Sequence, residues 1–255
     1  MPFRIDSTQR TAESPRLKAR MAGFLYLINI AAGVFIYGFI RSTLIAPGDA
    51  GATAANILKH ELVYRLGFVA AIILVACNVP LALIFYDLFK VVMRSLSLLV
   101  AFFILVATAV EADNLLNYFA PLILLRGAPY SNTFSVEQLQ FLAYVSLELH
   151  GVGFNVAVIF FAVYDLLIAY LVLRSTFLPR VLGLLMAIGG VCYLVNSFTS
   201  FLSPALAAHL VPYIQLPSGV AELSFCMWLL VIGVNAPLWE KQADAAKERQ
   251  IRWAV

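Results

Sequence analysis

The chain has 255 residues, of which 62% are hydrophobic and 12% are charged. The charged fraction is about half of that in an ordinary soluble domain, and the mean hydropathy is +0.91. These values exclude a disordered chain, a secreted disulfide scaffold and a nucleic-acid-binding protein. They also argue against a soluble enzyme, because no soluble fold has enough interior for so many apolar side chains. We therefore predict an integral membrane protein.

Six apolar segments are long enough to cross a bilayer, which takes about 20 residues in a helix. They are residues 21–41, 64–89, 95–119, 152–173, 181–202 and 217–237. The pattern predicts an all-α, polytopic bundle of six transmembrane helices over residues 21–237. A basic tail over 1–20 and a charged tail over 238–255 are both predicted to be cytoplasmic.

The orientation follows from the distribution of lysine and arginine. With the N-terminus inside, 13 of the 17 basic residues lie on the inner side, as the positive-inside rule requires. The four outer basic residues are Arg41, Lys59, Arg65 and Arg126. An even number of spans places both tails on the same side, so the sequence predicts a multi-pass membrane protein with both termini in the cytoplasm.

The outer loops contain short helical patterns. Asp49 follows Pro-Gly and is a good N-cap for a helix over 50–61. Ser135 with Gln138 three residues later is a capping-box pattern that should open a helix leading into the fourth span. Residues 203–216 contain two prolines and are too short to cross the bilayer, so they fit a re-entrant or an interfacial segment.

Several segments are similar to a known family. They are RSTLIAPGDAGATAANILKHELVYRLG at 41–67, HGVGFNVAVIFFAVYDLLIAYLVLRS at 150–175, RSTFLPRVLGLLMAIGGVCYLVN at 174–196 and AELSFCMWLLVIGVN at 221–235. With them the chain resembles the prokaryotic multi-pass membrane family named domain of unknown function 4386. The resemblance implies this membrane topology and a bacterial cytoplasmic membrane, but no activity. It marks Asp49 and Glu222 as positions of the family pattern, without roles.

Six polar residues inside the spans are predicted to share one depth. With a helical rise of 1.5 Å per residue, measured from the inner charged residues, they lie about 24–30 Å along their helices. In a hydrocarbon core of about 30 Å, that is the outer third. They are Glu111, Asp113, Asn114, Asn155, Asn196 and Glu222. Asp165, about 13 Å above Arg174, is a lesser candidate for a path through the bundle.

This polar layer has two interpretations. The carboxylates could be interfacial groups that bond neighbouring helices, or they could form a site for a cation, a proton or a small polar solute in a vestibule open to the outside. Several carboxylates with no lysine at the same depth favour a proton or a cation, because like charges in a low dielectric cannot all ionise. The predicted partners are the lipid bilayer and such a solute. The sequence predicts no nucleic-acid partner and no cofactor, and it leaves the oligomeric state open.

Two other classes of function stay open. A membrane-embedded, metal-dependent enzyme could use His150 with Glu111 or Glu222, although the chain has no HExxH motif and no closely spaced pair of histidines. A GxSxG motif is also missing, which leaves Ser/His/Asp catalysis without support. The remaining class is a structural or accessory membrane subunit.

Overall fold

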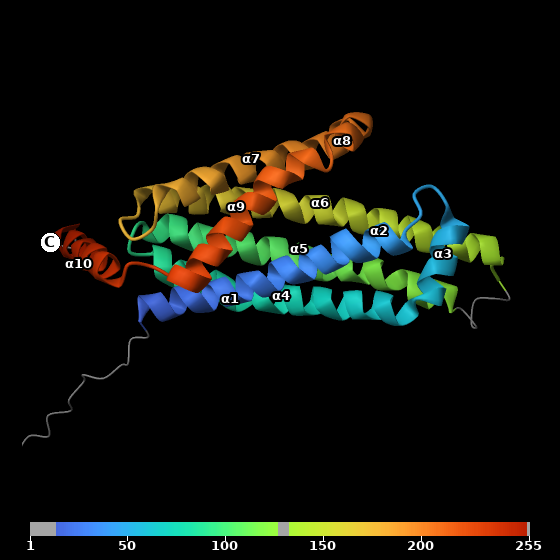
Figure 1. Cartoon of the computed structure of the whole chain (residues 1–255), viewed down its shortest axis with the longest axis horizontal. Coiled ribbons are helices and arrows are strands. Elements are labelled where there is room, and N and C mark those ends of the chain that lie inside the picture. Colours follow the sequence, from blue (N-terminus) through green and yellow to red (C-terminus); the bar gives the residue numbers. More distant parts are fainter. Residues whose placement is uncertain (1–13, 127–132, 254–255) are drawn as a thin grey trace, which may run out of the picture.

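The computed structural model describes residues 14–126 and 133–253, and every regular element within them is a helix (Figure 1). Six helical spans in these residues are long and apolar enough to cross a membrane. They run over Pro15–Leu44, Glu61–Phe89, Arg94–Leu125, Val136–Arg174, Arg180–Leu202 and Tyr213–Ile232. The predicted all-α architecture with six spans is confirmed.

The first five spans are longer than the apolar segments that predict them, the fourth by the most. The first span is composite, with a π-helical segment inside it. Its elements and those that follow are α1 (Pro15–Gly33), η1 (Val34–Ile40), α2 (Arg41–Leu44), α3 (Ala50–Lys59), α4 (Glu61–Phe89), α5 (Arg94–Leu125) and α6 (Val136–Arg174). The capping box at Ser135 is present and starts α6 well before the predicted fourth span. Because 39 residues of helix span about 58 Å, α6 extends far beyond a hydrocarbon core of about 30 Å.

The second half of the chain forms a pair of spans with a short turn and a terminal helix. Its elements are α7 (Arg180–Leu202), α8 (Pro204–Leu210), η2 (Tyr213–Gln215), α9 (Leu216–Met227), η3 (Trp228–Ile232) and α10 (Ala236–Trp253). The segment 203–216 is therefore the short helical turn between α7 and α9. Most of its side chains are exposed, which fits an interfacial segment.

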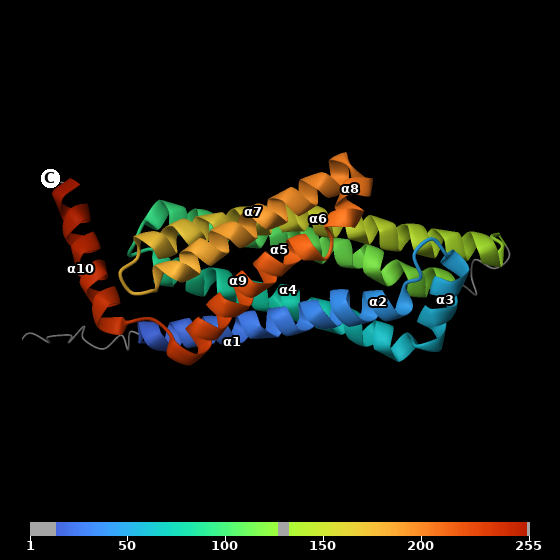
Figure 2. The ribbon, with the colours of Figure 1, turned by 45° about the horizontal axis from the view of Figure 1, so that its top comes forward.

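The bundle has two distinct ends. We call the end that carries Lys90, Arg94, Arg174 and Arg180 the basic end, and the opposite end, where α3 lies, the distal end (Figure 1). The start of α1 and the whole of α10 lie at the basic end. Towards the distal end, α5 and α6 continue past the turn between α7 and α9 (Figures 1 and 2).

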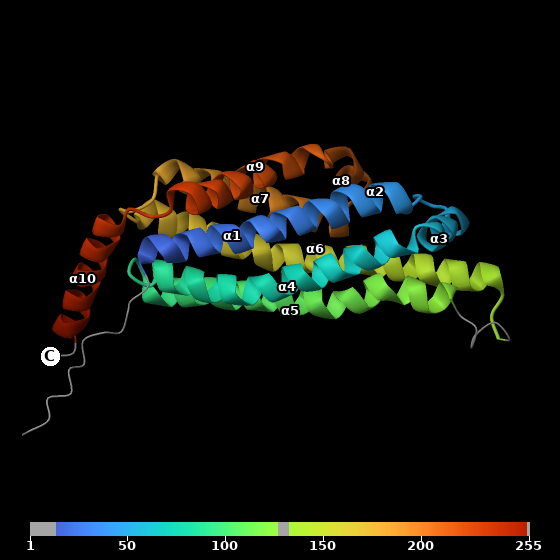
Figure 3. The ribbon, with the colours of Figure 1, turned by 60° about the horizontal axis from the view of Figure 1, so that its bottom comes forward.

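The last span ends at a glycine turn. Gly233 has φ +77°, a conformation that glycine adopts without the steric cost of a Cβ. The next helix, α10, turns away and lies across the basic end (Figures 2 and 3). The Trp239 indole holds it there by donating a 2.9 Å hydrogen bond to the Leu88 carbonyl.

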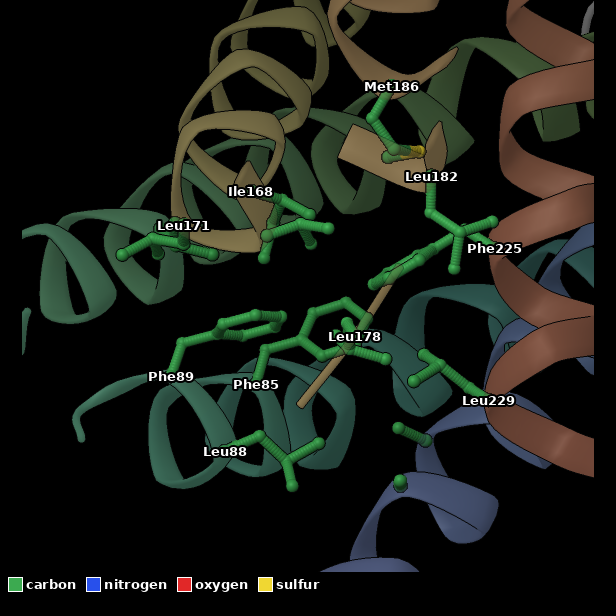
Figure 4. Close-up of a cluster of buried hydrophobic side chains, with 14 of the residues drawn as sticks. Phe85, Leu88, Phe89, Ile168, Leu171, Leu178, Leu182, Met186, Phe225 and Leu229 are labelled. Atoms are coloured by element: carbon green, nitrogen blue, oxygen red, sulfur yellow. The ribbon is translucent and has the colours of Figure 1, made fainter. Parts of the chain in front are cut away.

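The main apolar core lies towards the basic end. Phe85 and Phe89 of α4, Ile168 of α6 and Phe225 of α9 are buried against one another there (Figure 4). The outer surface of the bundle is also apolar, with Leu116 71% exposed. A continuous apolar exterior is unsuited to water and suited to lipid, so the surface agrees with a multi-pass membrane protein.

Candidate functional site

The Glu111 carboxyl lies in the distal half of the bundle. Its residue is 6% exposed, and the Tyr37 hydroxyl donates a 2.6 Å hydrogen bond to Oε1. The other oxygen, Oε2, is buried and has no hydrogen-bond partner in the described residues. A buried polar atom without a hydrogen-bond partner destabilises the fold, so the unpaired Oε2 marks Glu111 as a candidate functional residue of α5.

Tyr37 reaches Glu111 from the π-helical segment η1. A π-helix is a rare local widening of the helix that often occurs at functional sites. The Tyr37 ring lies parallel to that of His150 at a centroid distance of 6.2 Å and contacts that of Phe154 at 4.1 Å. Tyr37 therefore links the first span to both α5 and α6.

Asn114 joins α5 to α6 one turn after Glu111. Its amide donates a 2.8 Å hydrogen bond to the His150 carbonyl and lies beside the Glu111 carboxyl. The approach of the two helices depends on Gly153, because a Cβ at that position would collide with the Asn114 side chain. Asn114 is 3% exposed, so the contact is an interior one.

Two tyrosines lie on the distal side of this region. Tyr64 of α4 donates to the Tyr118 carbonyl, and Tyr118 donates to the Tyr64 carbonyl at 3.3 Å. Their rings stack with a centroid distance of 4.7 Å, and the Tyr118 ring meets that of His150 edge-on at 5.3 Å. We call Tyr37, Glu111, Asn114, Tyr118 and His150 the distal cluster.

A small cavity adjoins the distal cluster. It has a volume of about 20 Å³ and is lined by polar and apolar side chains, among them Tyr37, Arg41, Tyr64, Tyr118 and His150. A cavity needs about 10–15 Å³ to hold a water molecule. The space therefore accommodates one water molecule between polar groups that can bond to it.

The structure brings together only part of the predicted polar layer. Glu111 and Asn114 meet as expected, with His150 beside them, whereas Asp113 is exposed on another face of α5. At 100° per residue, two positions of separation turn Asp113 about 200° away from Glu111. Asn155 is half-buried and bonds within its own helix, donating to the Gly151 carbonyl at 3.0 Å.

The remaining predicted residues lie on other elements. Asn196 is buried on α7 with Oδ1 unpaired. Asp49 caps α3, accepting a 2.8 Å hydrogen bond from the Ala52 amide, as predicted from the sequence.

The expectation that Glu222 shares the depth of Glu111 does not hold. Glu222 is half-buried and interacts with Tyr26 and Asp165, which lie only about 9 Å from Arg20 and about 13 Å from Arg174 along their helices. The sequence estimate counted an unbroken helix to Glu240, but the span ends at Gly233. Glu222 therefore belongs to the half of the bundle nearer the basic end.

The metal-binding role considered for His150 finds no ligand set. Within residues 14–126 and 133–253, no three side chains of His, Cys, Asp or Glu come together in a way that could hold a metal ion. The His150 ring lies among the aromatic side chains of Tyr37 and Tyr118.

Sequence reasoning missed Tyr37 and Tyr118. Both are tyrosines within apolar stretches, and such surroundings are typical of aromatic residues that pack in the core or face lipid. A depth estimate of the kind applied to the acids would have placed Tyr37, 17 residues after Arg20, level with Glu111, 17 residues after Arg94, and Tyr118 about 10 Å further along α5. The pattern contains no signal for the π-helical turn that directs Tyr37.

Comparison with protein families gives one result. A family model described as domain of unknown function (DUF4386) matches residues 21–233, which include all six spans except the start of the first. The chain belongs to the DUF4386 family. The match agrees with the resemblance seen in the sequence, and the distal cluster lies within the matched region. No curated protein and no solved structure matches the chain.

Proposed function

We propose that this DUF4386 protein binds a proton at Glu111 and exchanges it with the side of the membrane that the distal end faces. The supporting observation is the Glu111 carboxyl itself, which is buried, is bonded by Tyr37 at one oxygen and is open at the other. The charge distribution predicts that this side is the outside.

The surroundings favour a proton over a larger ligand. The cavity of about 20 Å³ is of the size of one water molecule. The Tyr37 hydroxyl donates a hydrogen bond to the carboxyl, and the Asn114 amide beside it donates to the His150 carbonyl. A metal cation would instead need several oxygen ligands, so a small polar solute or a metal ion is less well served than a proton.

Tyr37 supplies a route to the carboxyl. It lines the cavity and also bonds Glu111, and a hydroxyl can donate one hydrogen bond while it accepts another. A proton arriving on a cavity water can pass to the phenol oxygen while the phenol proton moves to Glu111. Arg41 and His150 also line the cavity and set the local field, Arg41 as a fixed positive charge.

Infrared difference spectroscopy of the protein in lipid nanodiscs tests the proposal. Wild-type protein should show a carboxyl band that changes with pH, and Glu111→Gln should remove one component of it. Asp113→Asn, two residues away on an exposed position, is the matched control and should retain that component. Tyr37→Phe should shift its frequency and slow its exchange in deuterated buffer.

Two results would overturn the proposal. One is an unchanged carboxyl band in Glu111→Gln over the whole pH range. The other is a Glu111 band that exchanges at the same rate in wild type and Tyr37→Phe, which would remove the route through the cavity.

A further inference from the structure

A second group of polar side chains lies nearer the basic end, away from the distal cluster. Four helices contribute to it: Tyr26 from α1, Tyr164 and Asp165 from α6, Tyr193 from α7 and Glu222 from α9. The Tyr26 and Tyr164 hydroxyls are 3.1 Å apart. Two of its members are acidic, and the group lies within the apolar core.

Asp165 is the most deeply buried acid of the described residues. It is 1% exposed, and its Oδ1 atom has no hydrogen-bond partner. Glu222 is half-buried, its carboxyl lies beside the Tyr193 hydroxyl, and it interacts electrostatically with Asp165. Together they form what we call the carboxyl pair.

No cation accompanies the carboxyl pair. The five ion pairs of the described residues lie elsewhere and involve neither acid. The titratable groups that face the pair are the hydroxyls of Tyr26, Tyr164 and Tyr193 and the Cys226 thiol. All of these groups are neutral when protonated, so none offsets a negative charge.

Two negative charges cannot be held at this site. Burying one isolated carboxylate is already costly, and a second negative charge nearby adds Coulomb repulsion that a low dielectric strengthens. One negative charge is tolerable, because hydroxyl groups such as that of Tyr193 can donate hydrogen bonds to it.

We infer that Asp165 and Glu222 share a single proton and form a second proton-binding site, separate from Glu111. One of the two carboxyls carries the proton while the other is ionised, and the unpaired Oδ1 of Asp165 is an acceptor position for it. The inference does not depend on the role of Glu111, because the two groups lie on different helices and at different depths.

Labelling with a hydrophobic carbodiimide tests this inference. The reagent takes the proton of a neutral carboxyl, the resulting carboxylate adds to its central carbon, and the acyl group then migrates to nitrogen to give a stable N-acylurea. No atom leaves, so the mass of the peptide increases by that of the reagent. Full-length protein in lipid nanodiscs is labelled at a series of pH values, and the peptide containing Glu222 is measured by mass spectrometry.

Wild-type protein should be labelled at Glu222 at neutral pH, where an ordinary carboxyl is ionised. Asp165→Asn removes the second negative charge, so the pH of half-maximal labelling should fall by about one unit or more. Glu111→Gln should leave the labelling curve unchanged, which separates this result from the proposed function. Tyr193→Phe should alter the curve by less than Asp165→Asn does.

A labelling curve that is the same in wild type and Asp165→Asn would overturn the shared proton, as would a lack of labelling of Glu222 at neutral pH. Should Asp165→Asn fail to fold, Glu222→Gln provides the reverse measurement by infrared spectroscopy. The Asp165 carboxyl band should then change its pH dependence, and an unchanged band would contradict the inference.

Discussion

The side-chain amide of Asn114 occupies the space that a Cβ on Gly153 would fill. This contact between α5 and α6 allows Asn114 to reach the His150 carbonyl at 2.8 Å. The distal cluster therefore depends on a residue that contributes no side chain to it.

Replacing Gly153 with alanine should destabilise the protein. The added methyl group displaces Asn114 and breaks its bond to His150, at a cost of about 1–3 kcal/mol for overpacking. Thermal unfolding in detergent should show a lower melting temperature. Gly151→Ala on the same helix is the matched control, because a Cβ there meets only the Arg41 guanidinium at 3.7 Å, and its melting temperature should be unchanged or higher. Equal effects of the two substitutions would contradict this account.

Replacing Asp49 with alanine should loosen α3. The substitution removes the acceptor for the Ala52 amide, and the loss of an N-cap costs about 1 kcal/mol. Amide hydrogen exchange in residues 50–59 should become faster, while exchange in α5 stays the same. Asp49→Ser retains a capping oxygen and should behave like the wild type, so faster exchange in that variant as well would argue against capping as the cause.

The Glu61 carboxylate binds two arginines at the distal end, and this contact should be sensitive to salt. Arg65 approaches Oε1 at 2.6 Å, and Arg126 approaches Oε2 at 2.6 Å, which ties the end of α5 to the start of α4. Because the Arg126 side chain is 61% exposed, a double-mutant cycle of Glu61→Gln with Arg126→Ala should give a small, favourable coupling. Raising the salt concentration should reduce that coupling, and a coupling independent of salt would contradict an ion pair at the surface.

The predicted orientation can be tested with single cysteines and a membrane-impermeant maleimide. Lys59→Cys in α3 and Lys247→Cys in α10 are both exposed and lie at opposite ends of the bundle. In intact cells, only Lys59→Cys should be labelled, because the basic end is expected to face the cytoplasm. The wild type, whose three cysteines lie within the spans, supplies the blank. Labelling of Lys247→Cys alone would show that the orientation is opposite to the predicted one.

The spans and the helix caps could be predicted from the sequence because hydropathy and capping are local properties. Ser135 and Asp49 each act on backbone amides three residues away. The distal cluster was predictable in part, since Glu111 and Asn114 are polar residues at one depth of one helix. The contact of Tyr37 with Glu111 was not predictable, because no local pattern signals the π-helical segment that contains Tyr37.

The depth of Glu222 shows where such reasoning fails. Its estimate assumed that the sixth span runs on to residue 237, although Gly233 and Pro237 are both signals for the end of a helix. A span ending at Gly233 would have placed Glu222 about 15–17 Å from that end, near Asp165. Pairing the two acids still required the tertiary structure, because they lie on helices that are distant in the sequence.

The first span also packs against the last. Arg16 and Arg20 at the start of α1 donate hydrogen bonds to the carbonyls of Ile232 and Val231, at 3.2 Å and 3.1 Å. Gly23 lets the two helices touch, since a Cβ there would collide with the Leu230 backbone. During synthesis, α1 enters the bilayer before the other five spans and meets this neighbour only after the ribosome has made η3. The bundle can therefore close only after the sixth span has been made, and a chain cut short before η3 leaves Gly23 of α1 without the helix that packs against it.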